Sequence, residues 1–342
     1  MDVIDTIILG SGPSGFAAAF TLLKAGKKPL VITRNSFNNV CSEVTIESVE
    51  PVVDTLINDI CGKTIAATAS LGIFGGIYSD GQYTPTKFSG NSLRHGIHLD
   101  RGVFNAQLLS VMTNAGINII HDTKARNIFN DNNQVTIVLD DGRRLTASYL
   151  IDCTGRKQVA GRLLQLPRQY YSPRLTVWSG IDRINIQIPT YAASFISEEN
   201  GWTWLAPLEN GLTGWTRVAL TNHAALTPPF SIMENHKTGV RSADTRWRLF
   251  RPLYSGKILL AGDAAGVLDP AAGQGILNAL WTGKIAAEAA VKMIDEPTKE
   301  QTIVQQYDTW HFKRFEMLAE QLRSYYKVRR IIFAVFLELF IT

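Results

Sequence analysis

Apolar and polar positions at the start of the chain follow a strand–helix–strand pattern. Residues 3–9 form a short run rich in β-branched side chains, which favours a buried strand. After a glycine-rich turn, residues 16–24 carry apolar side chains at helical spacing, and Gly26 is typical of a helix C-cap. Residues 29–33 form a second apolar run. The pattern predicts two parallel strands joined by a right-handed helical crossover.

The next part of the chain combines one helical pattern with short strands. Residues 103–115 have the spacing of an amphipathic helix, and a strand is expected at 117–120. Residues 135–139 and 145–147 flank the turn at 140–142, Asp-Asp-Gly, which predicts a hairpin.

Helical patterns fade between about residues 170 and 250 and then return. Tryptophan, threonine, proline and aromatic content rises in that stretch, which favours a mainly antiparallel sheet. A strand is expected at 257–261, followed by a glycine-rich segment and a long helix over 275–293. Residues 300–342 have a helical pattern throughout. The sequence therefore predicts an α/β fold with a mainly antiparallel β-sheet domain and a C-terminal helical region.

Composition and charge exclude few classes of protein. The 342 residues are 45% hydrophobic and 19% charged, as in an ordinary globular protein with a substantial core. Lys and Arg total 34 against 30 Asp and Glu, a net charge of +4. These scattered charges indicate a solvated surface, with a patch facing an acidic substrate or partner as the alternative. Nucleic acid is not favoured as a partner.

Cysteine usage and the two ends of the chain bear on localisation. Cys41, Cys61 and Cys153 have an odd count and no metal-ligand spacing, so we expect no metal and a reducing, cytoplasmic environment. The acidic N-terminus lacks the features of a signal peptide. The apolar run at 331–342 contains Glu338 and is too short to span a bilayer. We expect a packed terminal helix there, or else an exposed contact for a partner or membrane surface.

The first turn carries a dinucleotide-binding pattern, GSGPSG, between a predicted strand and a predicted helix. Glycines at these places let the chain turn tightly and let backbone amides approach a pyrophosphate at the helix N-terminus. The candidate cofactor-binding residues are Gly10, Gly12, Pro13, Ser14 and Gly15.

The end of the second strand departs from the usual dinucleotide-binding pattern. An acidic residue that binds ribose hydroxyls is typical there, but the chain has Thr33 and Arg34. Thr33 offers a hydroxyl, and Arg34 is placed to face the adenine or a phosphate. We therefore expect weaker cofactor retention than usual.

A second glycine-rich segment, LAGDAAG, starts at residue 260 and precedes a long helix. An aspartate at a strand end can bind a ribityl hydroxyl, and a helix N-terminus can stabilise an anionic reduced flavin. The candidate residues here are Gly262, Asp263, Pro270, Gly273 and Gly275. Together with GSGPSG, this long pattern resembles the FAD-dependent monooxygenases of the para-hydroxybenzoate hydroxylase fold, over nearly the whole chain.

The resemblance implies FAD as the cofactor, bound by a Rossmann-like domain. Arg101, in the segment HLDR, matches the family's arginine that contacts FAD, and residues 151–156 resemble the turn that closes over the cofactor. No second GxGxxG follows a strand, so NAD(P)H bound transiently or a separate flavin reductase would supply electrons. The expected domains are an FAD-binding domain in two parts at 1–165 and 251–298, a β-sheet substrate domain at 166–250, and a C-terminal helical region at 299–342.

Two segments are similar to flavin-dependent halogenases. The sequence GWTWLAPL at 201–208 is similar to the Trp-x-Trp-x-x-Pro motif of tryptophan halogenases, and Trp202 and Trp204 fall on one side of a strand. We expect these two side chains to line a substrate chamber, with core packing as the alternative. Halogenation also needs a lysine in the tunnel, and neither Lys63 nor Lys87 aligns convincingly. Hydroxylation is therefore favoured over halogenation.

The segment around Glu43 resembles the flavoproteins that mature tryptophylquinone enzymes such as the lysine and cysteine tryptophylquinone oxidases. Ser42 stands where halogenases carry glycine, before Glu43. Glu43 is the candidate for positioning an indole or moving a proton, and Cys41 is a candidate reactive thiol, with surface and packing roles as alternatives. The resemblance implies hydroxylation of a tryptophan in a precursor protein. The alternatives are a halogenase, an isoprenoid reductase, and a non-catalytic maturation factor that binds the precursor.

Overall fold

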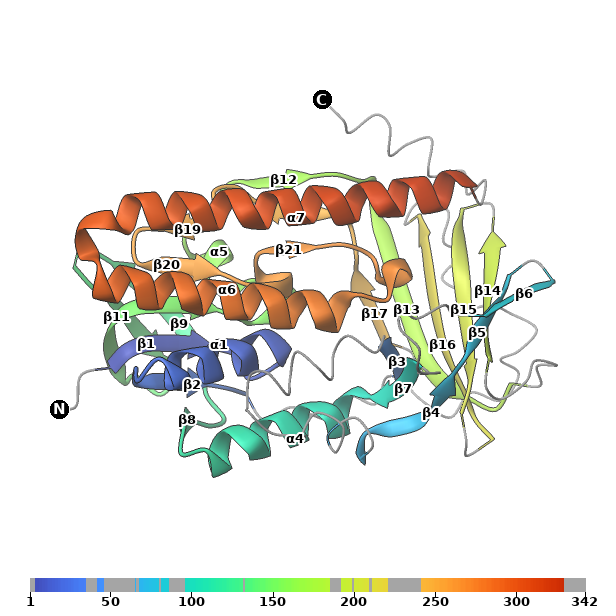
Figure 1. The fold of residues 1–342 in the computed structure, drawn as a ribbon, viewed down its shortest axis with the longest axis horizontal. Coiled ribbons are helices and arrows are strands. Elements are labelled where there is room, and N and C mark those ends of the chain that lie inside the picture. The colour runs from blue at the N-terminus through green and yellow to red at the C-terminus, as the bar shows by residue number, and fades with distance from the viewer. Residues whose placement is uncertain are drawn as a thin grey trace.

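The first strand–helix–strand unit lies inside an eight-stranded sheet (Figure 1). β1 (Ile4–Leu9) pairs in parallel with β2 (Pro29–Ile32) and with β11 (Arg144–Asp152), and all of β2 is buried. The remaining strands of this sheet are β8 (Asn118–Ile120), β9 (Ala125–Asn130), β10 (Val135–Leu139), β19 (Tyr254–Ser255) and β20 (Ile258–Leu260). The computed structural model describes residues 4–34, 42–45, 65, 68–79, 81–85, 96–131, 133–184, 192–198, 200–208, 211–220 and 241–328.

The order β20, β11, β1, β2, β8 is parallel throughout and places three strand ends together. β1, β11 and β20 end side by side at one edge of the sheet. Because parallel strands share their carboxyl edge, the segments that follow them meet there. Both glycine-rich segments start at this edge.

Three helices pack on one another beside the parallel sheet. α1 (Pro13–Lys24) packs against α6 (Gly275–Asp295), which in turn packs against α7 (Glu300–Val328). A Cβ added at Gly283 of α6 would lie 2.1 Å from the carbonyl oxygen of Ser14, so glycine lets the two helices approach closely. Two further helices among the described residues are α4 (Arg101–Asn114) and α5 (Val159–Leu163).

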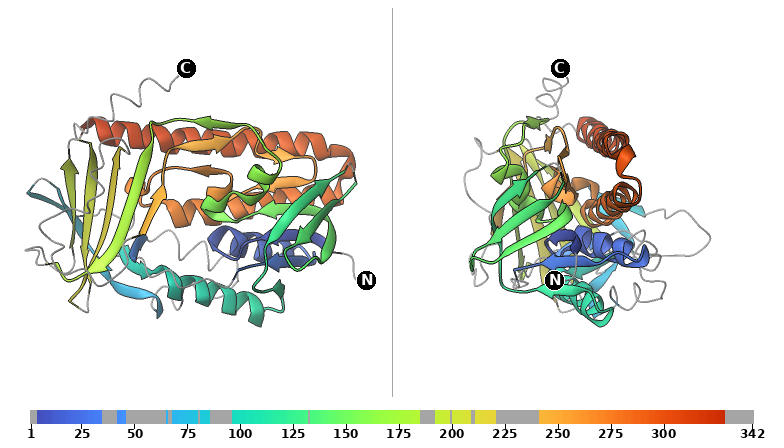
Figure 2. Two further views of the ribbon diagram at one scale, coloured as in Figure 1. Left: turned by 180° about the vertical axis from the view of Figure 1, so that it is seen from behind. Right: turned by 90° about the vertical axis from the view of Figure 1, so that its left-hand side faces the viewer.

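A seven-stranded sheet forms the second part of the molecule (Figures 1 and 2). Its order is β17, β13, β16, β15, β14, β5, β6, and every pair is antiparallel except β14 with β5. Two of its strands come from the first 165 residues. The bounds are β5 (Gly76–Ser79), β6 (Gln82–Pro85), β13 (Leu175–Asp182), β14 (Ala192–Glu198), β15 (Gly201–Pro207), β16 (Thr213–Leu220) and β17 (Arg241–Asp244).

Two three-stranded sheets complete the fold. One is formed by β3 (Ser42–Thr45), β7 (Gly96–Asp100) and β4 (Ser70–Phe74), and the other by β12 (Arg168–Tyr170), β18 (Arg248–Phe250) and β21 (Gly266–Val267). α7 extends from the parallel sheet to the seven-stranded sheet, as Figure 1 shows. The long helix therefore connects the two parts.

The predicted fold class is confirmed: a Rossmann-like sheet, a mainly antiparallel sheet and C-terminal helices. The predicted helix over 300–342 is present as α7, and residues 329–342, with the apolar terminal run, lie outside the described residues. Cys41, Lys63 and Lys87 also lie outside them. Across the described ranges, none of the helices is long and apolar enough to cross a membrane.

Candidate functional site

The glycine turn after β1 combines close packing with open space. Gly10 has φ +102°, and a Cβ there would lie 2.4 Å from the carbonyl oxygen of Cys153 on the neighbouring strand. A Cβ at Gly15 would lie 1.9 Å from the carbonyl oxygen of Gly10. A Cβ at Gly12 would meet nothing within 4 Å. Gly10 and Gly15 therefore let helix and strands pack, whereas Gly12 keeps the approach to the helix N-terminus free of a side chain.

The N-terminus of α1 has the properties that a pyrophosphate requires. Pro13 occupies its first turn, and Gly12 is the N-cap residue in an extended conformation. Backbone amides and the positive end of the helix dipole are available to an anion here. These residues fit the dinucleotide cofactor that the sequence implies.

Thr33 contributes its hydroxyl to the glycine turn. It is 5% exposed, and its Oγ1 lies 2.6 Å from Oγ of Ser11 in a hydrogen bond. Arg34 is exposed. At the position where an acid typically binds ribose, the chain thus has a buried hydroxyl that supports the turn itself.

The turn after β11 is held by Asp152, which is fully buried. Its carboxylate accepts hydrogen bonds from the backbone N–H of Thr154 at 2.9 Å, from the Thr154 hydroxyl at 2.6 Å, and from the backbone N–H of Ala160 at 2.6 Å. Burial raises the pKa of Asp152, and the three hydrogen bonds act against that rise. These contacts fix the segment that carries Arg156 and Gln158.

The LAGDAAG segment meets this turn at the same edge of the sheet. Nε of Arg156 lies 3.5 Å from Oδ2 of Asp263, and both side chains are 38% exposed. The backbone N–H of Gly262 donates to Oγ1 of Thr282 at 2.9 Å. A Cβ at Gly262 would lie 3.0 Å from Oγ of Ser14, which follows the first glycine turn. Both glycine-rich segments and the Asp152 turn therefore form one site.

Asp269 connects this site to the second sheet through buried hydrogen bonds. Its Oδ2 accepts from Nε1 of Trp247 at 2.7 Å, and its Oδ1 accepts from the Tyr326 hydroxyl at 2.5 Å. Oδ1 also accepts from the backbone N–H of Ala271 at 3.0 Å, which caps a short 3₁₀ turn, Pro270–Ala272. The Tyr326 hydroxyl accepts from Nε1 of Trp202 at 2.9 Å. We call Asp269, Tyr326, Trp202 and Trp247 the Asp269 cluster.

Burial dominates the electrostatics of this cluster. Burial raises the pKa of Asp269, while hydrogen bonds from Tyr326, Ala271 and Trp247 favour the ionised form. The carboxylate is 4% exposed. A buried carboxylate that accepts bonds from three segments of the chain fixes their relative positions. The cluster therefore holds the turn at 270–272 and the αL residue Gly273, with φ +62°, against α7 and β15.

The two tryptophans of GWTWLAPL have different environments. Trp202 is 2% exposed and stacks on Phe195 with ring centroids 5.3 Å apart. The expectation that it lines a chamber does not fit this burial, because its indole fills the core and its N–H is bonded to Tyr326. Trp204 is half-buried and packs against the same core. Its role in the substrate chamber stays a prediction.

The remaining candidates lie on separate elements. Glu43 is in β3, opposite Leu99 in β7, and its side chain is outside the described residues. Arg101 is the first residue of α4, directly after its N-cap Asp100. Gly275 is exposed at the start of α6.

Sequence reasoning did not single out the members of the Asp269 cluster other than Trp202. Asp269 precedes Pro270 in the second glycine-rich pattern, and this adjacency is the one local signal available. Tyr326 and Trp247 carry no motif, and their partners are distant in sequence.

Comparisons with known proteins identify a family and a fold. A family profile described as tryptophan halogenase matches residues 77–332. The chain is 23% identical over 352 residues to the digeranylgeranylglycerophospholipid reductase of Thermoplasma acidophilum, covering 92% of this chain and 85% of that protein. It is 25% identical over 355 residues to the reductase of the same name from Methanoculleus marisnigri, covering 95% of this chain and 85% of that protein.

Three solved structures share the fold. CmlS, a flavin-dependent halogenase, matches with a TM-score of 0.79 and 18% identity over 94% of this chain, which spans 64% of the CmlS chain. The brominase Bmp2 matches with a TM-score of 0.80 and 16% identity, covering 97% of this chain and 89% of its own. QhpG, a peptidyl tryptophan dihydroxylase essential for tryptophylquinone cofactor biogenesis, matches with a TM-score of 0.75 and 21% identity, covering 98% and 79%.

Proposed function

Because this chain belongs to the tryptophan halogenase family, we propose that it is an FAD-dependent monooxygenase that hydroxylates a tryptophan in a precursor protein. Flavin-dependent oxidoreductase chemistry on an aromatic group is the broader function that the family supports. Within that broader function, one observation favours tryptophan hydroxylation over halogenation. The match to QhpG extends over 98% of this chain at 21% identity, a higher identity than the matches to CmlS at 18% or Bmp2 at 16%.

The glycine-rich segments would hold the cofactor. The N-terminus of α1, beside Gly12, would bind the pyrophosphate, and Asp263 would bind a ribityl hydroxyl. Pro270, Gly273 and Gly275 precede or begin α6, whose N-terminus would stabilise negative charge on the ring system. When bound, reduced FAD supplies the electrons that activate O₂ for transfer to an aromatic ring.

The Asp269 cluster has a positioning role in this proposal. It fixes the turn at 270–272 to α7 and, through Trp202, to β15. Trp204 lies two residues further along the same strand and on the same face. A rigid link from this strand to the turn would keep substrate and cofactor in a constant geometry. Glu43 and Cys41 remain proposed as indole-positioning and thiol residues.

The partners in this proposal are the precursor protein and an electron donor. The donor would be NAD(P)H or a separate flavin reductase. Electron transfer from a reductase needs no permanent complex. A chemical reductant can therefore replace the electron donor in an experiment.

The experiment uses the FAD-loaded protein, a tryptophan-containing segment of a tryptophylquinone oxidase precursor, reductant and O₂. We expect a tryptophan residue heavier by the mass of one or two oxygen atoms. A matched reaction contains the same segment with phenylalanine in place of tryptophan, and no mass change is expected there. Unchanged tryptophan in a reaction that consumes O₂ would contradict the proposal.

An isoprenoid reductase is the second candidate. The curated relatives from Thermoplasma acidophilum and Methanoculleus marisnigri are both digeranylgeranylglycerophospholipid reductases, and each is matched over 85% of its length. A reductase would saturate the double bonds of a geranylgeranyl lipid and would not need O₂. Membership of the tryptophan halogenase family favours an oxidoreductase over a non-catalytic factor that only binds the precursor.

A further inference from the structure

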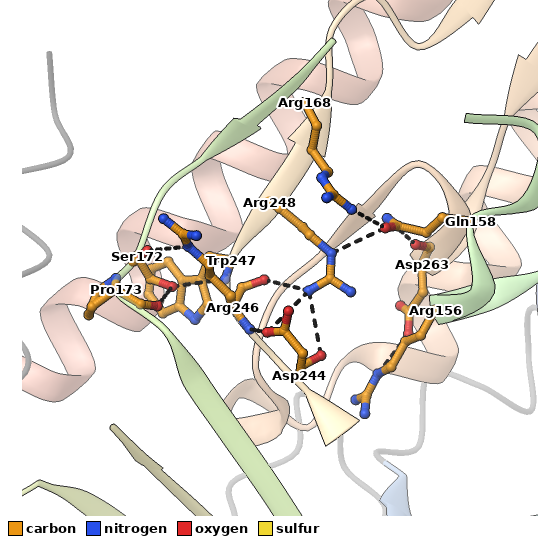
Figure 3. A network of polar contacts seen from close by, with 10 residues as sticks. All are labelled: Arg156, Gln158, Arg168, Ser172, Pro173, Asp244, Arg246, Trp247, Arg248 and Asp263. Atoms are coloured by element: carbon orange, nitrogen blue, oxygen red, sulfur yellow. Dashed lines mark hydrogen bonds and ion pairs between the residues drawn. The ribbon is translucent and has the colours of Figure 1, made fainter. Parts of the chain in front are cut away.

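Four arginine side chains take part in one network of polar contacts, on the turn after β11 and on the segments around β12 and β18 (Figure 3). Arg248 has a side chain only 6% exposed, Arg156 and Arg168 are exposed, and Arg246 is half-buried. These arginine side chains contact Gln158, Tyr170, Asp244 and Asp263. We call Arg156, Arg168, Arg246 and Arg248 the arginine cluster.

Two of these guanidinium groups share one neutral oxygen. Oε1 of Gln158 accepts from Nη1 of Arg168 at 3.2 Å and from Nε of Arg248 at 3.2 Å. Nε2 of Gln158 donates to the backbone carbonyl of Asp263 at 3.1 Å. Gln158 is 1% exposed and has φ +51°, in the left-handed region. A buried residue in a costly backbone conformation thus brings two like charges to one acceptor.

Two of the guanidinium groups also share one aromatic ring. Cζ of Arg246 lies 3.7 Å from the ring centroid of Tyr170, and Cζ of Arg168 lies 5.2 Å from it. Nε of Arg246 donates to the backbone carbonyl of Ser172 at 3.1 Å. These are cation–π and dipole contacts, which position an arginine without neutralising its charge.

Carboxylates neutralise only part of the cluster. Asp263 lies 3.5 Å from Arg156, and Asp244 lies 3.6 Å from Nη1 of Arg248 with a side chain that is 62% exposed. Burial lowers the pKa of Arg248; Asp244 and Asp263 raise it, and the nearby Arg168 and Arg156 lower it further. The contacts that position Arg168 and Arg246 are with neutral groups. Positive charge therefore exceeds negative charge at this place.

We propose that the arginine cluster is a binding site for a phosphate group of a ligand. A guanidinium fork matches the oxygens of a phosphate, and several arginines held in place by neutral partners lose little entropy when the anion binds. Arg248 forms the buried floor of the site, and the exposed Arg156 and Arg168 flank it. The ion pair of Arg156 with Asp263 places the site next to the segment proposed to hold FAD. A phosphate bound here would belong to a molecule that approaches the cofactor.

Two sources share this chemistry, a pyridine dinucleotide and a phospholipid headgroup. The first would be the electron donor, and the second would be part of a lipid substrate. The proposal does not depend on which bond the enzyme oxidises, because it concerns binding alone. Failure of tryptophan hydroxylation would leave it unaffected.

The test measures binding to the FAD-loaded protein. The probes are inorganic pyrophosphate and NADPH, followed by calorimetric titration, and vesicles of phosphatidylglycerol, followed by co-sedimentation. The variants Arg168→Gln and Arg246→Gln each remove one charge from the cluster, and Arg126→Gln removes an exposed charge from β9 as a matched control. FAD absorbance is recorded throughout, so that displacement of the cofactor is detected.

We expect at least one probe to bind without releasing FAD. Its binding should weaken about tenfold in Arg168→Gln and in Arg246→Gln, because each loses a charge-assisted contact, and should not change in Arg126→Gln. Tightest binding of NADPH would identify the dinucleotide source, and tightest binding of vesicles the lipid source. Three results would overturn the proposal: no binding of any probe, equal binding in the three variants, or binding that depends on the loss of FAD.

Discussion

The Tyr326 hydroxyl donates a hydrogen bond of 2.5 Å to Oδ1 of Asp269, 57 residues earlier in the chain. The same hydroxyl accepts from Nε1 of Trp202, 124 residues earlier. One tyrosine on α7 thus connects the turn before α6 to a central strand of the seven-stranded sheet. This hydroxyl group therefore links the segment proposed to hold FAD to the seven-stranded sheet.

Replacing Tyr326 with phenylalanine should destabilise the protein by about 1–3 kcal/mol, because the buried carboxylate of Asp269 and the buried indole N–H of Trp202 each lose one hydrogen bond. FAD retention should fall as well, because the turn at 270–272 loses its link to α7. Urea unfolding and FAD absorbance after gel filtration measure these two effects. Tyr254→Phe removes the hydroxyl of a half-buried tyrosine in β19 and serves as the control. Equal behaviour of the two variants would count against the role of Tyr326.

The tryptophans of GWTWLAPL should respond differently to substitution by phenylalanine. Trp202→Phe removes the donor to Tyr326, so we expect lower stability together with lower FAD retention. Trp204→Phe should leave stability nearly unchanged and reduce substrate oxidation. Unfolding curves, FAD content and oxygen-transfer rates distinguish the two. If Trp204→Phe lost stability and kept its rate, Trp204 would belong to the core and not to the substrate chamber.

Two glycines of the first turn provide a matched pair for testing the cofactor site. Gly15→Ala should destabilise the fold by about 1–3 kcal/mol or more, because its methyl group would overlap the carbonyl of Gly10. Gly12→Ala should fold normally, because its methyl group meets no protein atom within 4 Å, and should lose FAD. Thermal unfolding of the FAD-free proteins and FAD titration measure the two effects. Normal FAD affinity in Gly12→Ala would place the pyrophosphate elsewhere.

The parallel sheet and its helices were predictable because their signals are local. The strand, turn, helix and strand over residues 3–33 each have their own periodicity, and the structure places all of them as predicted. The association of β5 and β6 with the seven-stranded sheet was not predictable. These short strands pair with each other and, through β5, with β14, more than 100 residues away, and periodicity carries no information on such pairing.

The site was predictable to the extent that it rests on glycine spacing. The two glycine-rich segments meet at one edge because the strands that they follow, β1 and β20, both pair in parallel with β11. The hydrogen bonds of Asp269 and the pairing of Thr33 with Ser11 depend on side chains brought together by the whole fold. Strand alternation placed Trp202 and Trp204 on one face, but it could not say that Trp202 would be covered by α7.

The pH dependence of stability should report the buried His311. Burial lowers its pKa from 6.5 to about 4, so the folded protein holds it neutral. Its contribution to stability is fully present above pH 6.5 and is lost as the pH falls toward 4, because the unfolded chain then binds the extra proton. Between pH 7 and 4.5 the protein should lose roughly 2 kcal/mol from this group.

His311→Phe should remove that part of the acid sensitivity. Buried His98 and the buried carboxylates Asp152 and Asp269 titrate in both proteins, so the difference between the two curves isolates His311. Urea unfolding at several pH values measures it. Parallel curves for the two proteins would show that His311 does not titrate as its burial implies.

The mass of the product formed under isotopically labelled O₂ tests the proposed tryptophan hydroxylation most directly. The FAD-loaded protein would receive reductant, chloride and bromide, and both a tryptophan-containing precursor segment and a geranylgeranyl phospholipid. We expect labelled oxygen on the tryptophan and an unchanged lipid. A halogenated tryptophan, or a lipid that has gained hydrogen while the tryptophan stays unlabelled, would contradict it.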